Sequence, residues 1–204
     1  LGFNWNLAPV ADVSQNQNSF IYDRTLGQDT KTTAAYIETA VRAIQKQNVA
    51  ACLKHFPGYG SAGDTHTGFA EEDQMNLKPF EAGIKNGADT ILVAHVLIKS
   101  VDPNLPASLS PKIHALLRKK LGFKGVIVTD DLAMGAIKQF SETQHVCPEV
   151  LAVKAGNDLI MSENVDSGTA SIEQAIKAKQ ISQKQIDQSV LRILKLKEKL
   201  GLLK

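Results

Sequence analysis

Short apolar segments alternate with amphipathic helical segments along the chain, and this alternation restricts the possible folds more than any other feature. The predicted strands are the apolar stretch within residues 2–13 and segments 49–56, 90–96, 125–129 and 158–161. The predicted helices are 32–47, 79–86, 110–121, 148–155 and two stretches between 172 and 200. Continuously apolar strands separated by helices are typical of a parallel sheet covered on both faces. The chain is therefore predicted to have an α/β fold.

The residues that follow these strands favour a barrel over an open, doubly wound sheet. A polar residue stands at the end of almost every strand, namely Asp12, His55, His95 and Asp130. A (β/α)8 barrel builds its active site from such residues, contributed by the carboxyl ends of several strands. The phosphate-binding motifs G-x-G-x-x-G and G-x-x-x-x-G-K-[ST] follow no strand, so the sequence does not support nucleotide binding.

The number of strands falls short of a complete barrel. Five strands and a weak sixth near the C-terminus are fewer than the eight that a barrel forms in about 250 residues. We therefore expect residues 1–204 to be a single domain, a (β/α)8 TIM barrel truncated at its N-terminus, with the first strands preceding Leu1. The edges of such a gap are unpaired, which favours self-association through the gap.

Composition excludes several classes of function. The 204 residues are 43% hydrophobic and carry a formal net charge of +2, which gives no reason to expect binding to nucleic acid or to a membrane surface. No apolar run approaches the roughly 18 residues of a membrane span. Cys52 and Cys147 are far apart and form no C-x-x-C pair, so Cys52 is read as a small buried side chain. This use of cysteine favours the cytoplasm.

One glycine-rich loop concentrates groups that could act in catalysis. The segment KHFPGYGSAGDTHTGF, residues 54–69, contains Lys54, His55, Asp64 and His66. A carboxylate two residues from an imidazole can fix the ring tautomer and stabilise its protonated form, so Asp64 and His66 could act as a general acid/base. Two other interpretations remain open: a hydrogen bond that only shapes the loop, and a metal site of His55, Asp64 and His66, which lacks the helical spacing of H-E-x-x-H.

The strand at 125–129 runs directly into two adjacent carboxylates, Asp130 and Asp131. Side chains alternate along a strand, so only one of the two can point into the mouth of a barrel. Alternation by itself leaves open which of the two it is. A carboxylate at this rim suits the nucleophile of a retaining glycosidase. The simpler alternative makes one member of the pair the N-cap of the following helix.

Taken together, these segments resemble glycoside hydrolase family 3, and within it the bacterial β-N-acetylglucosaminidases. The matching stretches occur in the family's order and extend over essentially all of the chain: FNWNLAPVADV, RTLG, KHFPGYG, GDTH, ILVAHV, the LP-S-LS stretch at 105–110, LGFKGVIVTDDLAMGAI, AGNDLIM and VLRILKLKEKLGL. KHFPG together with TDD-L-x-M makes the resemblance highly specific.

The resemblance implies a role for each candidate residue. It makes Asp130 the nucleophile, which together with strand alternation predicts that Asp130 faces the mouth of the barrel and that Asp131 does not. It makes His66 the general acid/base and Asp64 the partner of His66. The resemblance also implies that Lys54, His55 and Arg24 bind hydroxyl groups of the sugar. It implies that Asp12 and Met134 line the pocket. It implies neither a metal nor another cofactor.

The sequence departs from the family pattern in two places. Tyr59 stands where the family usually has His in a P-G-H-G stretch, and the loop from Tyr59 to Asp64 is one residue short. Both changes could alter how the loop closes. The acidic, glycine-rich segment D-x-E-G-G-R, which grips the sugar in the family, does not occur in residues 1–204.

The resemblance implies a retaining glycosidase that removes terminal β-linked N-acetylglucosamine from cell-wall-derived glycans, as in peptidoglycan recycling. The Asp64-x-His66 loop favours this branch over the β-glucosidases of the family, which lack it. A β-glucosidase or a glycoside phosphorylase is the alternative within enzymes. The alternative of another class is a catalytically incompetent barrel fragment, because groups that position the sugar would be missing.

Overall fold

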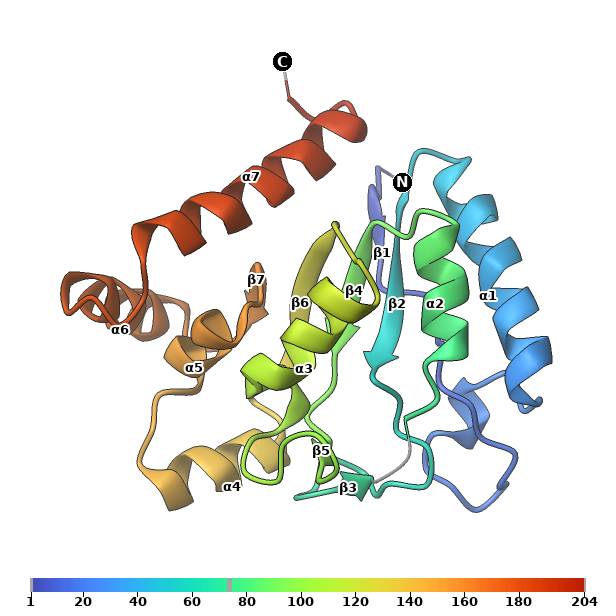
Figure 1. Ribbon diagram of the computed structural model, residues 1–204, viewed down its shortest axis with the longest axis horizontal. Helices are drawn as coiled ribbons and strands as arrows, with labels where there is room; N and C mark the ends of the chain where they lie inside the picture. Colours follow the sequence, from blue (N-terminus) through green and yellow to red (C-terminus); the bar gives the residue numbers. More distant parts are fainter. Residues whose placement is uncertain (1, 73–74, 204) are drawn as a thin grey trace.

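The computed structural model describes residues 2–72 and 75–203. These residues form a parallel sheet flanked by helices (Figure 1). The strands are β1 (Trp5–Asn6), β2 (Ala50–Phe56), β3 (Glu71–Glu72), β4 (Thr90–Val93), β5 (Leu97–Ile98), β6 (Val126–Asp131) and β7 (Leu159–Met161). The α-helices are α1 (Thr30–Gln45), α2 (Lys78–Lys85), α3 (Pro111–Ala115), α4 (Gly135–Gln144), α5 (Pro148–Ala155), α6 (Val165–Lys177) and α7 (Gln183–Lys199). Short 3-10 turns lie at Tyr22–Arg24 and Ala107–Leu109, and a π-helical turn at Leu116–Lys120.

The main sheet has five parallel strands in the order β1-β2-β4-β6-β7. Strands that are neighbours in this sheet follow one another along the chain, as in a barrel, and the strand order is never reversed. The short strands β3 and β5 form a separate parallel pair near the carboxyl ends of the main strands (Figure 1). The carboxyl ends of the five main strands therefore lie at one edge of the molecule.

The two faces of the sheet carry different sets of side chains. One face packs against α1 and α2, where Ile37, Val41 and Phe80 meet the strand residues Leu53 and Ile91 in the main hydrophobic core. The opposite, concave face carries the alternate strand residues, with Cys52, Leu92 and Val128 at its centre and Trp5, Leu7, Leu159 and Met161 around them. Among the described residues, no helix contributes to the apolar cluster of the concave face, and this is the arrangement of side chains found in a (β/α) barrel wall.

Local sequence signals explain where several helices begin and end. Asp29 and Ser182 act as N-caps of α1 and α7, and each side chain accepts a hydrogen bond from a backbone N–H of the first turn. Proline occupies the first turn of α2 and of α5. Gly156 ends α5 in the left-handed conformation at φ 116°, which glycine adopts without steric cost.

The predicted α/β class is confirmed, and strands occur within all five predicted segments. The first strand is shorter than its apolar stretch: it covers Trp5–Asn6, and Val10 adds one isolated bridge to Lys54. The weak sixth strand near the C-terminus is wrong, since residues 165–177 and 183–199 are helical. The predicted helix at 110–121 is divided between α3 and the π-helical turn.

The described residues do not close into an eight-stranded barrel. In residues 2–72 and 75–203 the main sheet ends at β1 on one side and at β7 on the other. Its interior face is consequently less well covered at the edges, where Trp5, Leu7, Leu159 and Met161 are only partly buried. None of the helices in this part of the chain is long and apolar enough to cross a membrane.

Candidate active site

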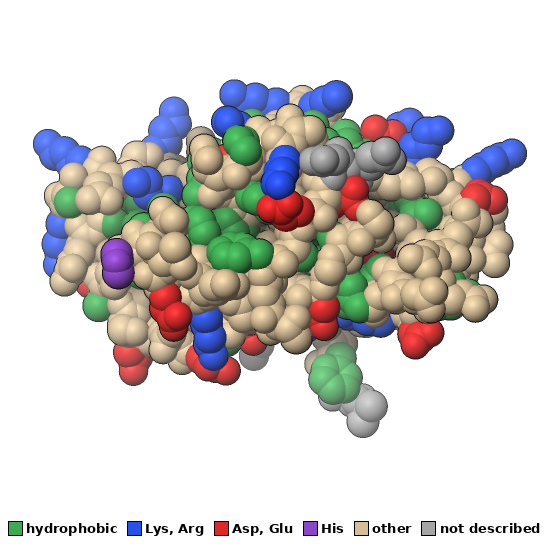
Figure 2. Space-filling view, turned by 90° about the horizontal axis from the view of Figure 1, so that it is seen from below, with side chains coloured by type: hydrophobic (Ala, Val, Ile, Leu, Met, Phe, Trp, Pro, Cys, Tyr) green, Lys and Arg blue, Asp and Glu red, His purple; other side chains and the backbone are tan. Residues whose placement is uncertain are grey.

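The predicted site residues gather at the carboxyl edge of the sheet, which Figure 2 views face-on. Their charges act on one another there. Asp130 and Arg24 both influence the pKa of Lys54, and Arg24 also influences the pKa of Asp64. Asp130 and His66 both influence the pKa of His95. Segments that are up to about a hundred residues apart in the sequence thus contribute to one electrostatic neighbourhood.

Strand alternation places Asp130 on the concave face of β6. Val128, two residues earlier, belongs to the apolar cluster of that face, whereas Ile127 packs into the helix-covered core. Asp130 is half-buried, and its charge reaches Cys52 and Lys54 on the neighbouring β2. Burial raises the pKa of the Cys52 thiol to about 12, so that side chain is neutral and packs as a small apolar group.

Asp131 has a different role from Asp130. Its Oδ1 accepts a hydrogen bond from the backbone N–H of Ala133 at 2.9 Å, which stabilises the turn after β6. The helix that follows, α4, begins only at Gly135 and has Met134 in the N-cap position with no side-chain cap. The alternative in which one of these carboxylates caps the following helix is therefore wrong, because three residues separate Asp131 from Gly135 and Met134 occupies the N-cap position.

His95 is a residue that the sequence placed at a strand end but not in the site. It is 1% exposed, and its Nε2 donates to the carbonyl oxygen of Asp131 at 2.8 Å. Its Nδ1 then accepts from the hydroxyl of Ser108 at 2.7 Å, which fixes the neutral tautomer. Burial lowers the pKa of His95, although the charge of Asp130 opposes that effect. His95 thus holds the chain at the end of β6, immediately after Asp130.

Asp64 and His66 form a hydrogen-bonded pair on the exposed loop. Asp64 Oδ1 accepts from the ring Nδ1 of His66 at 2.6 Å and from the His66 backbone N–H at 2.9 Å. Burial raises the pKa of Asp64, but the hydrogen bonds from His66 outweigh that effect and hold the pKa below its usual value. The ring is 54% exposed and its Nδ1 is engaged, which leaves Nε2 as the nitrogen available to a substrate.

Lys54 and Arg24 bring positive charge to the same edge. Lys54 is half-buried near the end of β2, and burial, reinforced by the charge of Arg24, lowers the pKa of its ammonium group. Arg24 closes the 3-10 turn at Tyr22–Arg24 and is exposed. Both side chains have donors suited to the hydroxyl groups of a sugar.

Behind Arg24 lies a buried chain of hydrogen bonds. The guanidinium of Arg24 donates to His55 Nε2 at 2.9 Å, so Nδ1 carries the proton and donates to Asp12 Oδ2 at 2.8 Å. Asp12 also accepts from the backbone N–H groups of His55 and Tyr59. Asp12 and His55 are 1% and 3% exposed. Protein groups thus engage both ring nitrogens of His55, and the geometry gives Asp12 and His55 the task of holding Arg24.

Met134 is buried at the start of α4, close to the end of β6. The metal interpretation that combined His55, Asp64 and His66 has no counterpart in the geometry. Nowhere in residues 2–72 and 75–203 do three or more His, Cys, Asp or Glu side chains group as they would around a metal ion.

The chain matches a family model over residues 1–196, described as the glycosyl hydrolase family 3 N terminal domain. A beta-N-acetylglucosaminidase/beta-glucosidase of Cellulomonas fimi is 31% identical over 99% of this chain and 39% of its own length. A beta-hexosaminidase of Stenotrophomonas maltophilia is 38% identical over 66% of this chain and 42% of its own.

Comparison of structures gives the same result. A solved glycoside hydrolase family 3 beta-N-acetylglucosaminidase from Paenibacillus sp. superposes with a TM-score of 0.88 at 36% identity, over 98% of this chain and 40% of that one. The chain thus spans about 40% of the length of these relatives. The match to the family model, the shared fold and the motif residues gathered at one sheet edge show that this chain belongs to glycosyl hydrolase family 3.

Proposed function

We propose that this site carries out retaining hydrolysis of glycosides with a terminal β-linked N-acetylglucosamine. The observation that carries the proposal is the Asp64–His66 pair, joined by a 2.6 Å hydrogen bond on a loop at the edge where β6 presents Asp130. A retaining glycosidase needs a nucleophile and a separate acid/base, and these two groups supply them.

In the first step, a carboxylate oxygen of Asp130 attacks the anomeric carbon as its bond to the leaving oxygen breaks. Protonated His66 gives its Nε2 proton to that oxygen, and the ring becomes neutral. In the second step, water attacks the anomeric carbon and releases Asp130 as a carboxylate, while His66 Nε2 takes the water's proton. Asp64 accepts the Nδ1–H throughout and stabilises the protonated ring.

An imidazole suits this role for two reasons. Its reference pKa lies near neutrality, whereas a carboxylic acid must be desolvated to remain protonated at neutral pH. A neutral ring also adds no second negative charge beside Asp130. The same property would tolerate phosphate as the acceptor in the second step, so a glycoside phosphorylase remains the second candidate.

The positively charged groups would bind the sugar. We propose that Arg24 and Lys54 donate hydrogen bonds to its hydroxyls, with Arg24 held in place by His55 and Asp12. Met134 would contribute apolar surface at the start of α4. The names of the two curated relatives support an N-acetylglucosaminide over a glucoside, although one of those names includes both activities.

We further propose that the curled five-stranded sheet is part of a (β/α)8 barrel in which α1 and α2 belong to the outer ring of helices. The division between a helix-covered face and a concave face with the predicted nucleophile supports this.

Peptidoglycan-derived glycans are the proposed source of the substrate. Self-association through the edges of β1 and β7 would cover the groups that the open sheet leaves unpaired.

The test compares 4-nitrophenyl β-N-acetylglucosaminide with the matching glucoside, in water and in phosphate. We expect preferential release of N-acetylglucosamine. For His66→Gln we expect kcat to fall about 100-fold to 10,000-fold, because water attack in the second step loses its general base whatever the leaving group. Peptide mapping after trapping with a slow substrate should place the sugar on Asp130. A preference for the glucoside, or glycosyl phosphate as product, would favour the second candidates. If the wild-type protein hydrolyses neither glycoside, and Asp130→Asn does not change how tightly the glycosides bind, the chain is a catalytically incompetent fragment.

A further inference from the structure

We propose that Tyr59 and Gly135 are positioning residues for the acid/base. In this proposal, which rests on the function proposed above, they hold the loop 59–69 at a fixed place against the end of β6. The loop carries Asp64 and His66, and β6 carries Asp130, so the two contacts would set where the proton donor stands relative to the nucleophile.

The first contact joins the loop to the N-terminus of α4. The backbone N–H of Gly135 donates to the carbonyl oxygen of His66 at 3.2 Å, and that of Ala136 donates to the carbonyl oxygen of Thr65 at 3.1 Å. The first N–H groups of a helix have no partner within the helix, so the loop satisfies donors that would otherwise face solvent. Only a short turn separates this helix end from Asp130, so the nucleophile and the loop share one support.

Gly135 makes this close approach possible. A Cβ atom at this position would lie 2.6 Å from the carbonyl oxygen of His66 and 3.1 Å from the carbonyl carbon of Thr67. Both of these are backbone atoms, so the loop itself would have to move to make room. A side chain at residue 135 would thus displace the residue that carries the imidazole.

The second contact lies inside the loop. The hydroxyl groups of Tyr59 and Thr65 are 2.6 Å apart, and both residues are almost fully buried. Burial raises the pKa of Tyr59, so its hydroxyl remains protonated and can donate. The Tyr59 ring packs edge-on against Phe20 and His55. Thr65 is thereby pinned between a rigid aromatic anchor and the N-terminus of α4, one residue before His66.

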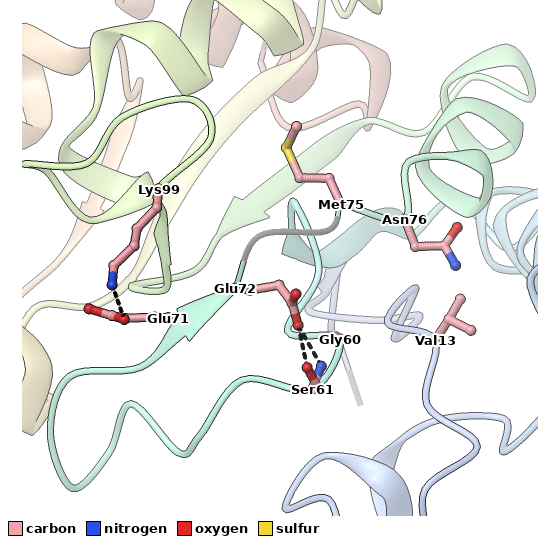
Figure 3. Close-up of a pocket in the computed structure, with 8 residues that line it drawn as sticks. All are labelled: Val13, Gly60, Ser61, Glu71, Glu72, Met75, Asn76 and Lys99. Atoms are coloured by element: carbon pink, nitrogen blue, oxygen red, sulfur yellow. Dashed lines mark hydrogen bonds and ion pairs between the residues drawn. The ribbon is translucent and has the colours of Figure 1, made fainter.

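The start of the loop is fixed independently. The backbone N–H of Tyr59 donates to Asp12, and the backbone N–H and hydroxyl of Ser61 donate to Glu72 Oε2 at 2.6 and 3.0 Å (Figure 3). A cavity of about 640 Å³ lies beside this part of the loop. Lys99 and Glu71 both line this cavity and form an ion pair with each other. Tyr59 and Ala62 pack into the main hydrophobic core, and these hydrogen bonds add to that packing at the start of the loop.

These contacts have a catalytic consequence because the imidazole itself is held only lightly. The ring of His66 is 54% exposed, and its side-chain partner, Asp64, belongs to the same loop. The hydrogen bonds between Asp64 and His66 do not connect the loop to β6. The Tyr59–Thr65 hydrogen bond and the backbone hydrogen bonds to the N-terminus of α4 provide that connection.

The test combines Tyr59→Phe, Thr65→Val, their double variant and Gly135→Ala. Tyr36→Phe, on the exposed side of α1, and Gly68→Ala, whose Cβ would meet no atom closer than 3.6 Å, are the matched controls. Turnover is measured with an alkyl N-acetylglucosaminide, which needs a proton donor, and with the 2,4-dinitrophenyl glycoside, whose leaving group needs little protonation. Hydrogen exchange of the Gly135 and Ala136 amides is measured without substrate.

We expect Tyr59→Phe and Thr65→Val to lower kcat/KM about tenfold to a hundredfold on the alkyl glycoside and far less on the dinitrophenyl glycoside. The double variant should lose no more than either single one, and Gly135→Ala should behave alike. All should speed exchange of the two amides, while the controls stay at wild type. Equal losses on both substrates would indicate general damage to the fold and overturn the proposal.

Unchanged exchange of the Gly135 and Ala136 amides in Tyr59→Phe would also overturn the proposal, even if turnover falls. Thermal unfolding of each variant shows whether it is folded. If the wild-type protein turns over no N-acetylglucosaminide, the proposed function fails instead. The exchange measurements then still decide whether Tyr59 and Gly135 hold the loop, so the two failures are distinguishable.

Discussion

Replacing Asp12 with asparagine removes one charge and no atom of the side-chain skeleton, which makes it a sharp test of the buried hydrogen bonds behind Arg24. Asp12 is 1% exposed and accepts three hydrogen bonds, at 2.8 to 2.9 Å, from two backbone N–H groups and one imidazole. Asparagine keeps a single oxygen. That oxygen should face His55, where it can serve two donors, and the amide NH2 then faces the backbone N–H of Tyr59.

The expected loss of stability follows from counting these contacts. The buried backbone N–H of Tyr59 loses its acceptor and faces the amide NH2 of the asparagine instead. The two hydrogen bonds from His55 keep an acceptor, but that acceptor is now neutral. Hydrogen bonds to charged groups contribute about 1.5–3 kcal/mol and neutral ones about 1, so Asp12→Asn should cost about 3 kcal/mol after allowing for easier burial of the neutral side chain. For a chain of this length, that corresponds to a fall in Tm of about 6–12 °C.

Urea unfolding at neutral pH measures the free energy directly, with Asp23→Asn as the control on an exposed aspartate of the neighbouring 3-10 turn. The Tyr59 end of the loop should loosen as well, so exchange of the Tyr59 amide should rise in the Asp12 variant and not in the control. A loss of less than about 1 kcal/mol would refute the reasoning, because it would mean that the charge of Asp12 contributes no more than a neutral acceptor.

Four further predictions follow from other contacts. His95→Phe keeps a ring but has no donor for the carbonyl oxygen of Asp131, so kcat should fall about tenfold to a hundredfold while the protein stays folded; wild-type kcat would contradict this. Burial lowers the pKa of His95 and of His114, so below the reference value of 6.5 the unfolded chain takes up protons that the folded chain refuses. Unfolding free energy should then fall with decreasing pH, by up to about 1.4 kcal/mol per pH unit for each histidine, and a flat profile between pH 7 and 5.5 would be inconsistent. The buried carboxylate of Asp158 is paired with two arginines, so Asp158→Asn should lower the free energy of unfolding in urea by about 3–5 kcal/mol. A loss of less than about 1 kcal/mol would argue against a stabilising role for that pairing. Sedimentation of residues 1–204 should reveal association through β1 and β7, and a stable monomer would contradict the open-edge argument.

The class of the fold was readable from the sequence because hydrophobic periodicity is a local property. An apolar run such as residues 50–56 can only be a buried strand or a buried helix turn, and its length and flanking turn residues decide between them. Alternation along β6 likewise showed that only one of Asp130 and Asp131 could face the mouth, and the family motif pointed to Asp130. Asp64 and His66 are only two positions apart in the sequence, so this pair was equally visible.

Tertiary structure decided which partners each of these groups has. Asp12 meets residues 43 and 47 positions later, and His95 meets the carbonyl oxygen of Asp131 36 positions later. Hydrogen bonds between distant segments leave no periodic pattern, and backbone acceptors carry no side-chain signature at all. The seat of the His66 loop on Gly135 is of this kind, because it joins main-chain atoms and depends on an absent Cβ. Motifs in the sequence thus pointed to the proposed reacting groups, while only the folded chain brings together the groups that hold them in place.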